Sequence, residues 1–568
     1  SDAGRAFQIV EFSARSIESL ERLSDRVATF LETRSDVSFA DLCYTLRVGR
    51  KKMPFRRAVV ASSALQAATL LQTHDESRVF ARTDAKTRRD VCLMFPGAGA
   101  HQVGMAAGLY RTEPVFRQEM DRCLDRVRDV AGIDARAVLY PGGDAEVARL
   151  RLQEPAFFLA ALFAVEYSLA KLWISWGIVP SVVMGHSAGE YVAACIAGVM
   201  SVDDAIRMNL QRVRGSAALP PAAMLTVGLP EAELRPLAEQ FDVDIAIVNS
   251  PTTCMVAGLV ADIDRLEAAL ASRQVDTRRL AVSGASHCRL VAPLVPAFRA
   301  AFEKVRLAPP KIAFISAMTG KMVTAEVATP GYWVDHYQRT VHFSDALETA
   351  LADPARVLLE VGPGTALSSL ARQVIAARGL GERVLVSSMR RPNDAEPDED
   401  YLARAIARLS LSGVAIEAAA YHRGERRLKC DAPLYPFARR RHWLPSDPWC
   451  RSGAAPLEAE PHEPETALDA SSAATTARDD SAPPETETER EMTAIWSRAL
   501  GITIQNVNAD YFDLGGTSLQ GLGLKRSMDS AFGIGILASG VLGESTVRKR
   551  AQGGVQLRSR TESDATKA

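Results

Sequence analysis

The pattern of apolar and polar positions predicts an α/β chain with more than one domain. Near the N-terminus it predicts strands over 7–12 and 57–62, with an amphipathic helix over 16–33 between them. Further along, apolar residues recur at every third and fourth position over 151–176, which is typical of a helix in a protein core. Because 568 residues are too many for one hydrophobic core, we expect several domains.

Residues 217–283 are predicted to form short strands that alternate with short helices. Strands are predicted over 223–227, 244–248, 254–257 and 277–282, and helices over 231–240 and 260–272. The order βαββαβ predicts a ferredoxin-like subdomain inserted in the larger α/β domain.

Composition, charge and cysteine spacing exclude several classes of protein. The formal net charge is −1, which gives no strong field, so neither nucleic acid nor a membrane is expected as a partner. The eight cysteines include no CxxC pair, so we expect free thiols, a cytoplasmic location and no metal site. No signal peptide is recognised at the start of the sequence. The most apolar stretch, 155–174, carries Glu166 and Lys171, which favours a buried helix over a membrane span.

The first candidate site is the stretch VVMGHSAGEY at 182–191. It places Gly-x-Ser-x-Gly between a predicted strand and a predicted helix, which is the pattern of a nucleophile elbow. A sharp turn there would push the Ser187 hydroxyl into a cleft, and the N–H groups of the following helix would face developing negative charge. The same pattern also occurs in glycine-rich turns that merely contain serine, so the surrounding sequence has to decide.

A glycine-rich loop, VCLMFPGAGAHQVGM at 91–105, supports the elbow. It lacks the fingerprints of phosphate and dinucleotide loops. Together with GHSAGEY it resembles the malonyl-CoA:acyl carrier protein acyltransferase family, and within it the acyltransferase domains of polyketide synthases. The resemblance implies an α/β-hydrolase-like core in which the backbone N–H groups of Ala98 and Ala188 form an oxyanion hole. The usual pattern is FPGQGxQ, and here Ala98 and His101 stand at its two glutamine positions.

The resemblance also implies the reacting residues. Arg212 stands 25 residues after Ser187, where the family places the arginine that binds a substrate carboxylate with its planar fork. His287 stands 100 residues after Ser187, where the family places the general base that a serine nucleophile requires. No acid follows at a recognisable place, so a Ser–His dyad is expected. Gly284 and Ser286 occupy positions at which the family distinguishes its extender units.

Three further positions near the site leave alternatives open. Asn249 either shapes the pocket or forms a turn. His186 is expected to pack within the turn, close to the cleft. Glu154 replaces the usual glutamine, and its charge would oppose an anionic substrate if it lined the pocket.

A second candidate site lies near the C-terminus, in the stretch ADYFDLGGTSLQGLGL at 509–524. It resembles the phosphopantetheine attachment motif of carrier proteins. The resemblance implies covalent 4′-phosphopantetheine on Ser518, installed by a phosphopantetheinyl transferase. A helix that begins at Ser518 would favour the phosphodiester anion. A plain helix cap would explain Ser518 but not the whole run.

These assignments divide the chain into six segments. Residues 42–60 and 432–445 resemble the linkers that flank acyltransferase domains in modular polyketide synthases, so an upstream ketosynthase and other synthase modules are expected partners. Residues 451–485 are rich in Ala, Pro, Glu, Ser and Thr and indicate a disordered tether. The predicted domains are an α/β linker subdomain (1–88), an acyltransferase domain (89–385), a post-acyltransferase linker (386–449), a disordered linker (450–485), a small all-α carrier-protein helix bundle (486–555) and a disordered tail (556–568).

The sequence thus predicts a polyketide synthase acyltransferase that selects malonyl-CoA, forms acyl-Ser187 and loads a phosphopantetheine arm on Ser518. The small residues Gly284 and Ser286 leave methylmalonyl-CoA or another substituted malonyl-CoA open as the extender. An acyl-thioester hydrolase would use the same elbow with water, but it requires an acid between the serine and the histidine. A binding protein with a decayed site would explain the departures from the family pattern, but not the retained serine, histidine and arginine.

Overall fold

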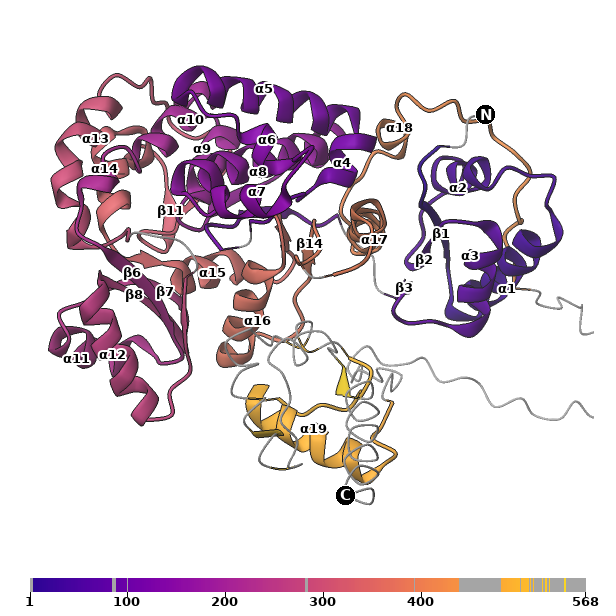
Figure 1. Ribbon diagram of the computed structural model, residues 1–568. Coiled ribbons are helices and arrows are strands. Elements are labelled where there is room, and N and C mark those ends of the chain that lie inside the picture. The colour runs from indigo at the N-terminus through magenta and orange to yellow at the C-terminus, as the bar shows by residue number, and fades with distance from the viewer. Residues whose placement is uncertain are drawn as a thin grey trace, which may run out of the picture.

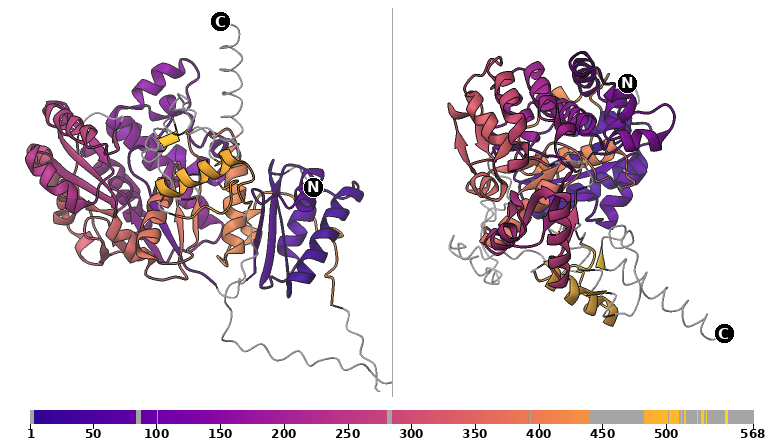
Figure 2. Two further views of the ribbon diagram at one scale, coloured as in Figure 1. Left: turned by 90° about the horizontal axis from the view of Figure 1, so that it is seen from below. Right: turned by 60° about the vertical axis from the view of Figure 1, so that its left-hand side comes forward.

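The computed structural model describes residues 4–83, 88–99, 101–280, 285–392, 394–438, 482–500 and 502–509, with a few single positions between 511 and 547. Three sheets organise these residues, and helices pack against each sheet (Figures 1 and 2). The α/β fold class predicted from the sequence is confirmed by this mixture of elements.

The N-terminal unit is built on an antiparallel sheet that lies at one end of the molecule (Figure 1). Its elements are β1 (Gln8–Ala14), α1 (Ile17–Thr33), α2 (Phe39–Val48), β2 (Phe55–Ala61), α3 (Ala64–Thr73) and β3 (Val79–Arg82). The strands pair in the order β1-β2-β3. The two strands and the helix predicted here are confirmed, each within two residues at either end. A separate apolar core lies between them, and the later segment around Tyr435 packs onto it.

The second sheet has six strands and carries the candidate site. Its strands are β4 (Val91–Phe95), β5 (Val182–Gly185), β10 (Ala313–Ser316), β11 (Lys321–Val323), β13 (Val357–Glu360) and β14 (Leu385–Ser387). They lie in the order β11-β10-β5-β4-β13-β14, and only β10 and β11 pair antiparallel. Every residue of β4 and β5 is buried, which explains their unbroken apolar sequence. Phe95 pairs with Gly185, so the chain leaves both strands at the same edge of the sheet.

Helices around β4 and β5 enclose the main core. They are α4 (Ala107–Thr112), α5 (Pro114–Ala131), α6 (Ala135–Leu139), α7 (Ala145–Arg151), α8 (Pro155–Ser175), α9 (Gly189–Ala197) and α10 (Val202–Gln211). By length and composition α8 could cross a membrane, but 89% of its most apolar window is buried inside the protein. The prediction of a core helix is therefore confirmed.

The predicted start of this core helix is wrong. Instead of one helix from residue 151, α7 ends at Arg151 and α8 begins at Pro155. Proline fits the first turn of a helix but forces the preceding residue into an extended conformation. Glu154 is extended, with φ −70° and ψ 132°, so α8 cannot begin before Pro155.

The third sheet is formed mainly by residues 217–283, for which an inserted subdomain is predicted. Its elements are β6 (Ala222–Val227), α11 (Glu231–Gln240), β7 (Asp244–Ser250), β8 (Thr253–Leu259), α12 (Val260–Ser272), β9 (Thr277–Arg279) and, later in the chain, β12 (Val341–His342). The sheet order is β12-β7-β8-β6-β9. Both predicted helices have the predicted bounds, whereas β9 ends at Arg279 rather than at residue 282. Residues 281–284 lie outside the described part of the chain.

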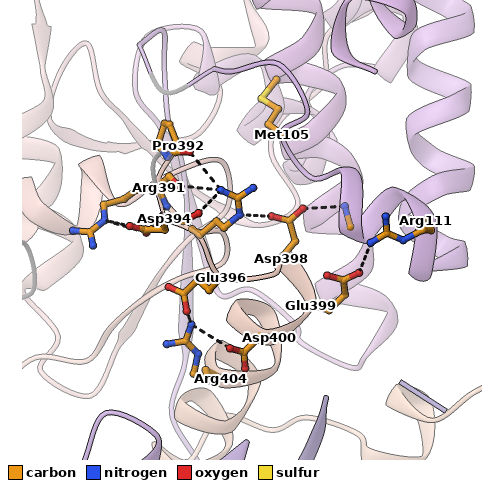
Figure 3. A network of polar contacts seen from close by, with 12 residues as sticks. Met105, Arg111, Arg391, Pro392, Asp394, Glu396, Asp398, Glu399, Asp400 and Arg404 are labelled. Carbon is orange, nitrogen blue, oxygen red and sulfur yellow. Dashed lines mark hydrogen bonds and ion pairs between the residues drawn. The ribbon is translucent and has the colours of Figure 1, made fainter. Parts of the chain in front are cut away.

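The remaining elements close the large unit. They are η1 (Ser216–Ala218), η2 (Arg289–Leu294), α13 (Val295–Phe302), η3 (Glu326–Ala328), α14 (Pro330–Gln338), α15 (Phe343–Leu351), α16 (Ala366–Arg378), α17 (Asp398–Leu411) and α18 (Ala418–Tyr421). Figure 3 shows a polar network at the start of α17. There Asp398 accepts hydrogen bonds from the Gly108 N–H (2.9 Å) and from Arg390 Nε (2.9 Å), which fixes α17 against α4. Asp400 pairs with Arg78 of the N-terminal unit at 2.7 Å.

The C-terminal region contains α19 (Glu487–Leu500) and a small apolar core. Trp496 of α19 is buried in it and packs edge-on against Tyr511, with ring centroids 5.1 Å apart. Ser518 and the predicted tether up to residue 481 lie outside the described residues, so the predicted helix bundle stays a prediction.

Candidate active site

Ser187 lies in the turn between β5 and α9, in an uncommon backbone conformation. Its φ is +52°, the left-handed region that residues other than glycine rarely adopt. The glycines on either side are sterically required. A Cβ on Gly185 would lie 2.2 Å from the Glu190 N atom, and one on Gly189 would lie 2.2 Å from the Phe95 carbonyl oxygen. These approaches account for the Gly-x-Ser-x-Gly pattern.

The glycine-rich loop after β4 packs directly on this turn. A Cβ on Gly97 would lie 2.7 Å from the His186 carbonyl oxygen and 3.5 Å from the Ser187 Cβ atom. The amides of Ala98 and Ala188 therefore lie near the serine. Within the described residues, neither amide donates a hydrogen bond to a protein atom. Their predicted role as an oxyanion hole stays a prediction.

His287 is hydrogen-bonded to Ser187, with 2.7 Å between Nε2 and Oγ. Its backbone is held by a hydrogen bond from its N–H to the Tyr337 carbonyl at 3.2 Å, and its side chain is buried. Burial lowers the pKa of His287 well below its usual range, and the charge of Arg212 lowers it further. A neutral imidazole beside a serine hydroxyl can accept its proton at neutral pH.

The other ring nitrogen of His287, Nδ1, is buried without a hydrogen-bond partner. The backbone of His336 opposes the lowering of the His287 pKa. No ion pair joins His287 to a carboxylate among the described residues, and the Ser–His dyad stays a prediction.

Arg212 brings a buried positive charge to the same place. Its Nη2 atom lies 3.5 Å from Ser187 Oγ, and the residue is only 5% exposed. The guanidinium lies over the rings of Tyr191 and Tyr337, at 5.6 and 5.7 Å from their centroids. Nη1 is buried without a hydrogen-bond partner, and no described carboxylate pairs with the side chain. A buried cation in this state is suited to an anionic ligand.

His186 and Asn249 join the site to the inserted sheet. Nε2 of His186 lies 2.8 Å from Oδ1 of Asn249, and the His186 ring packs edge-on against Phe343. Burial lowers the pKa of His186, although its bond to Asn249 opposes that shift. The turn-forming alternative for Asn249 is wrong, because the residue lies within strand β7. Its side chain instead holds the residue next to the nucleophile.

A buried polar cluster behind the dyad is not foreseen from the sequence. Helix α14 brings His336 against His287, with ring centroids 5.6 Å apart. His336 Nε2 lies 3.4 Å from Oε2 of the fully buried Glu190, whose other oxygen contacts the Tyr332 hydroxyl. The available signal was Glu190 itself, a charged residue at the start of an otherwise apolar helix.

The positions that depart from the family pattern have distinct surroundings. The His101 ring stacks on Phe158 with centroids 4.8 Å apart, and its Nδ1 lies 3.4 Å from the Gly99 N atom. Burial lowers the pKa of His101 to about 4. Glu154 is exposed at the start of α8, so its charge is solvated. Ser286 Oγ lies 3.9 Å from Met224 Sδ, while Gly284 lies outside the described residues.

Comparison with known families gives three matches along the chain. Residues 92–416 match the acyl transferase domain. Residues 8–71 match a family described as CurL-like, PKS C-terminal. Residues 490–552 match the phosphopantetheine attachment site, a range that includes Ser518.

Individual relatives carry names from polyketide synthesis. A phenolphthiocerol/phthiocerol polyketide synthase of Mycobacterium tuberculosis is 33% identical over 530 residues, which cover 91% of this chain. This chain spans only 35% of that relative's length. Polyketide synthase GfsA of Streptomyces halstedii is 32% identical over 76% of this chain and 6% of its own length.

Solved structures are similar over about three quarters of the chain. The acyl transferase domain of ZmaA superimposes with a TM-score of 0.71 at 31% identity, covering 76% of this chain and 99% of its own. The acyl transferase domain of SpnD, in complex with 2-(pent-4-yn-1-yl)malonyl, gives a TM-score of 0.67 at 33% identity, covering 74% of this chain and 98% of its own.

Proposed function

The chain belongs to the acyl transferase domain family, and from that premise we propose that it transfers a malonyl group from CoA to a phosphopantetheine arm through Ser187. It is an acyltransferase of a polyketide synthase with a phosphopantetheine-binding carrier domain. The buried cation of Arg212, 3.5 Å from the nucleophile, carries the finer proposal. The Arg212 guanidinium can bind a free carboxylate on the same acyl group that Ser187 attacks.

In the first half-reaction, His287 accepts the proton of Ser187 as Oγ attacks the thioester carbon. The Ala98 and Ala188 N–H groups hold the resulting oxyanion, and one such donor contributes about 3–4 kcal/mol. The tetrahedral intermediate expels the CoA sulfur, which takes the proton from His287. Ser187 then carries the acyl group as an ester, while Arg212 holds its distal carboxylate.

The second half-reaction reverses these roles. The phosphopantetheine arm supplies a terminal thiol as the acyl acceptor, and Ser518 is the residue expected to carry that arm. His287 removes the thiol proton during attack on the ester and returns it to Ser187 Oγ as the serine leaves. Both halves share one site, so the kinetics are expected to be ping-pong.

Malonyl-CoA is our preferred extender, and methylmalonyl-CoA or another substituted malonyl-CoA is the alternative. Arg212 is compatible with both extenders, since each carries the free carboxylate that it would bind. The SpnD domain bound to a substituted malonyl supports the broader class. The extender choice is expected to depend on Gly284 and on Ser286, whose Oγ lies 3.9 Å from Met224 Sδ.

We also propose a domain arrangement for this chain. The order β9-β6-β8-β7, with α11 and α12 between strands, supports a ferredoxin-like insert in an α/β-hydrolase-like core. The linker, carrier and tail boundaries given above are part of the proposal, as are a cytoplasmic location, a phosphopantetheinyl transferase and an upstream ketosynthase as partners.

One competition experiment tests this function. It compares the two extenders as substrates, and the carrier arm with water as acceptors of the acyl group. The phosphopantetheinylated protein is given equal malonyl-CoA and methylmalonyl-CoA, and both carrier loading and free acid release are measured. Malonyl on the carrier, with little free malonate, supports the proposal. Dominant release of free malonate would support an acyl-thioester hydrolase instead, whereas methylmalonyl on the carrier would change only the extender.

A further inference from the structure

A cavity of about 90 Å³ lies in the N-terminal unit, on a different sheet from Ser187. Strand β1, helices α1 and α2, the loop into β2 and a late segment of the chain all contribute to it. One acidic residue, Glu11, lines the cavity. Five cationic residues also line it: Arg47, Arg50, Lys51, Lys52 and Arg56.

Glu11 is already balanced by two of these cations. Lys52 Nζ lies 3.4 Å from its Oε1 atom, and Arg47 Nε lies 3.5 Å from its Oε2 atom. Burial would raise the pKa of Glu11, but Lys52 and Arg47 outweigh it and the pKa is lowered. The carboxylate is therefore ionised and cannot neutralise further positive charge.

The other cations keep an excess of positive charge at the cavity. Arg50 and Lys51 are exposed, and neither pairs with a carboxylate among the described residues. The Arg47 side chain is 2% exposed, and its Nη1 atom has no hydrogen-bond partner. Burial lowers the pKa of Arg56, although the charge of Glu11 opposes that shift.

The cationic loop is held in place before any ligand arrives. Ser13 Oγ accepts a hydrogen bond from the Met53 N–H (2.9 Å) and donates one to the Lys51 carbonyl (3.3 Å). Arg56 Nε donates to the Met53 carbonyl at 2.9 Å. On the other side, the Tyr435 hydroxyl accepts a hydrogen bond from the Arg15 N–H at 3.0 Å. A site held in this way loses little entropy on binding.

We propose that this cavity binds an organic phosphate, with the phosphate among the cations and the rest of the ligand against the apolar walls. Five cations against one acid favour a dianion over a single carboxylate. Phe12, Leu46 and Met53 offer an apolar surface that inorganic phosphate would not use. The site is independent of the acyl transfer proposed for Ser187.

Calorimetric titration of the full chain at constant ionic strength tests this site. The probes are pantetheine 4′-phosphate, adenosine 3′,5′-bisphosphate and inorganic phosphate, and hydrogen exchange over residues 46–56 locates the binding. We expect at least one organic probe to bind more tightly than inorganic phosphate and to protect that segment. The two organic probes distinguish a pantetheine phosphate from a nucleotide source.

Charge variants decide whether the cavity is responsible. Arg50→Gln with Lys51→Gln removes two exposed cations and should weaken the organic probe at least tenfold without changing Ser187 acylation. Arg273→Gln with Arg278→Gln removes equal charge from exposed positions of the inserted unit and should change nothing. Unprotected residues 46–56 at saturating probe, equal binding of inorganic phosphate, or equal weakening by both double variants would each overturn the proposal.

Discussion

Nη2 of Arg212 lies 3.5 Å from Oγ of Ser187, so a buried positive charge stands beside the nucleophile. The same charge lowers the pKa of His287, the hydrogen-bond partner of that serine. Arg212 therefore affects both the choice of substrate and the protonation of the base, His287. The predictions below separate the two effects.

Removing the Arg212 charge should change which acyl groups are transferred. A charge-assisted hydrogen bond contributes about 1.5–3 kcal/mol, so Arg212→Ala should reduce kcat/KM for malonyl-CoA about ten- to a hundredfold. Acetyl-CoA has no free carboxylate and should lose far less. The measurement is the ratio of kcat/KM for the two thioesters. Arg207→Ala is the matched control, because Arg207 is exposed on the preceding helix.

The pH dependence of acylation should report the depressed pKa of His287. Since its neutral form is the base and its pKa is lowered well below 6.5, kcat/KM should stay constant as the pH falls from 7.5 to 6.5. Activity should decline only below that range. Arg212→Gln removes one cause of the depression, so its acidic limb should move to higher pH. An acidic limb unchanged by this variant would show that Arg212 does not act on His287.

The turn at Ser187 should not tolerate a methyl group on its second glycine. Gly189→Ala places a Cβ 2.2 Å from the Phe95 carbonyl oxygen, so backbone atoms must shift. Overpacking of this kind costs about 1–3 kcal/mol. The measurement is the free energy of unfolding in urea, followed by acylation of Ser187. Gly143→Ala has nothing within 4 Å of the new methyl and serves as the control. Equal stability of the two variants would contradict the packing account.

His101 should act as a positioning residue for the oxyanion loop. Its stack on Phe158 and its contact with the Gly99 N–H support the loop where the family pattern has glutamine. An aromatic pair of this kind contributes about 0.5–1.5 kcal/mol. His101→Ala should therefore lower kcat several-fold with little change in KM, and His101→Gln should restore part of it. Because its pKa is about 4, His101 is neutral above pH 6, and its loss should leave the pH profile unchanged there.

Local patterns predicted much of the fold and the paired motifs of the site. Helices 231–240 and 260–272 were correct to the residue, because hydrophobic periodicity is a local signal. The proximity of Arg212, His287 and Asn249 to Ser187 came from the family resemblance, since only the tertiary fold brings such distant positions together. The structure supplied the burial of Arg212 and the cluster of Glu190, Tyr332 and His336, which no local pattern encodes.

Two errors in the sequence-based interpretation have a clear physical cause. The core helix predicted from residue 151 begins only at Pro155, because the residue before a proline avoids helical geometry. Asn249 resembled a turn residue, but it lies within β7, at an irregularity of the pairing with β8 between Val248 and Ser250. The five cations of the cavity lie together in the sequence between Arg47 and Arg56, but only the fold places Glu11 and Tyr435 beside them.

The central claim is that Ser187 carries the acyl group, and mass spectrometry of peptides tests it most directly. The protein is mixed with malonyl-CoA, quenched in acid and digested, and Ser187→Ala is treated in parallel. We predict a malonyl ester on the peptide that contains Ser187, and none on that peptide in the variant. A malonyl group on the same domain of Ser187→Ala, or its absence from Ser187 in an active protein, would contradict the account.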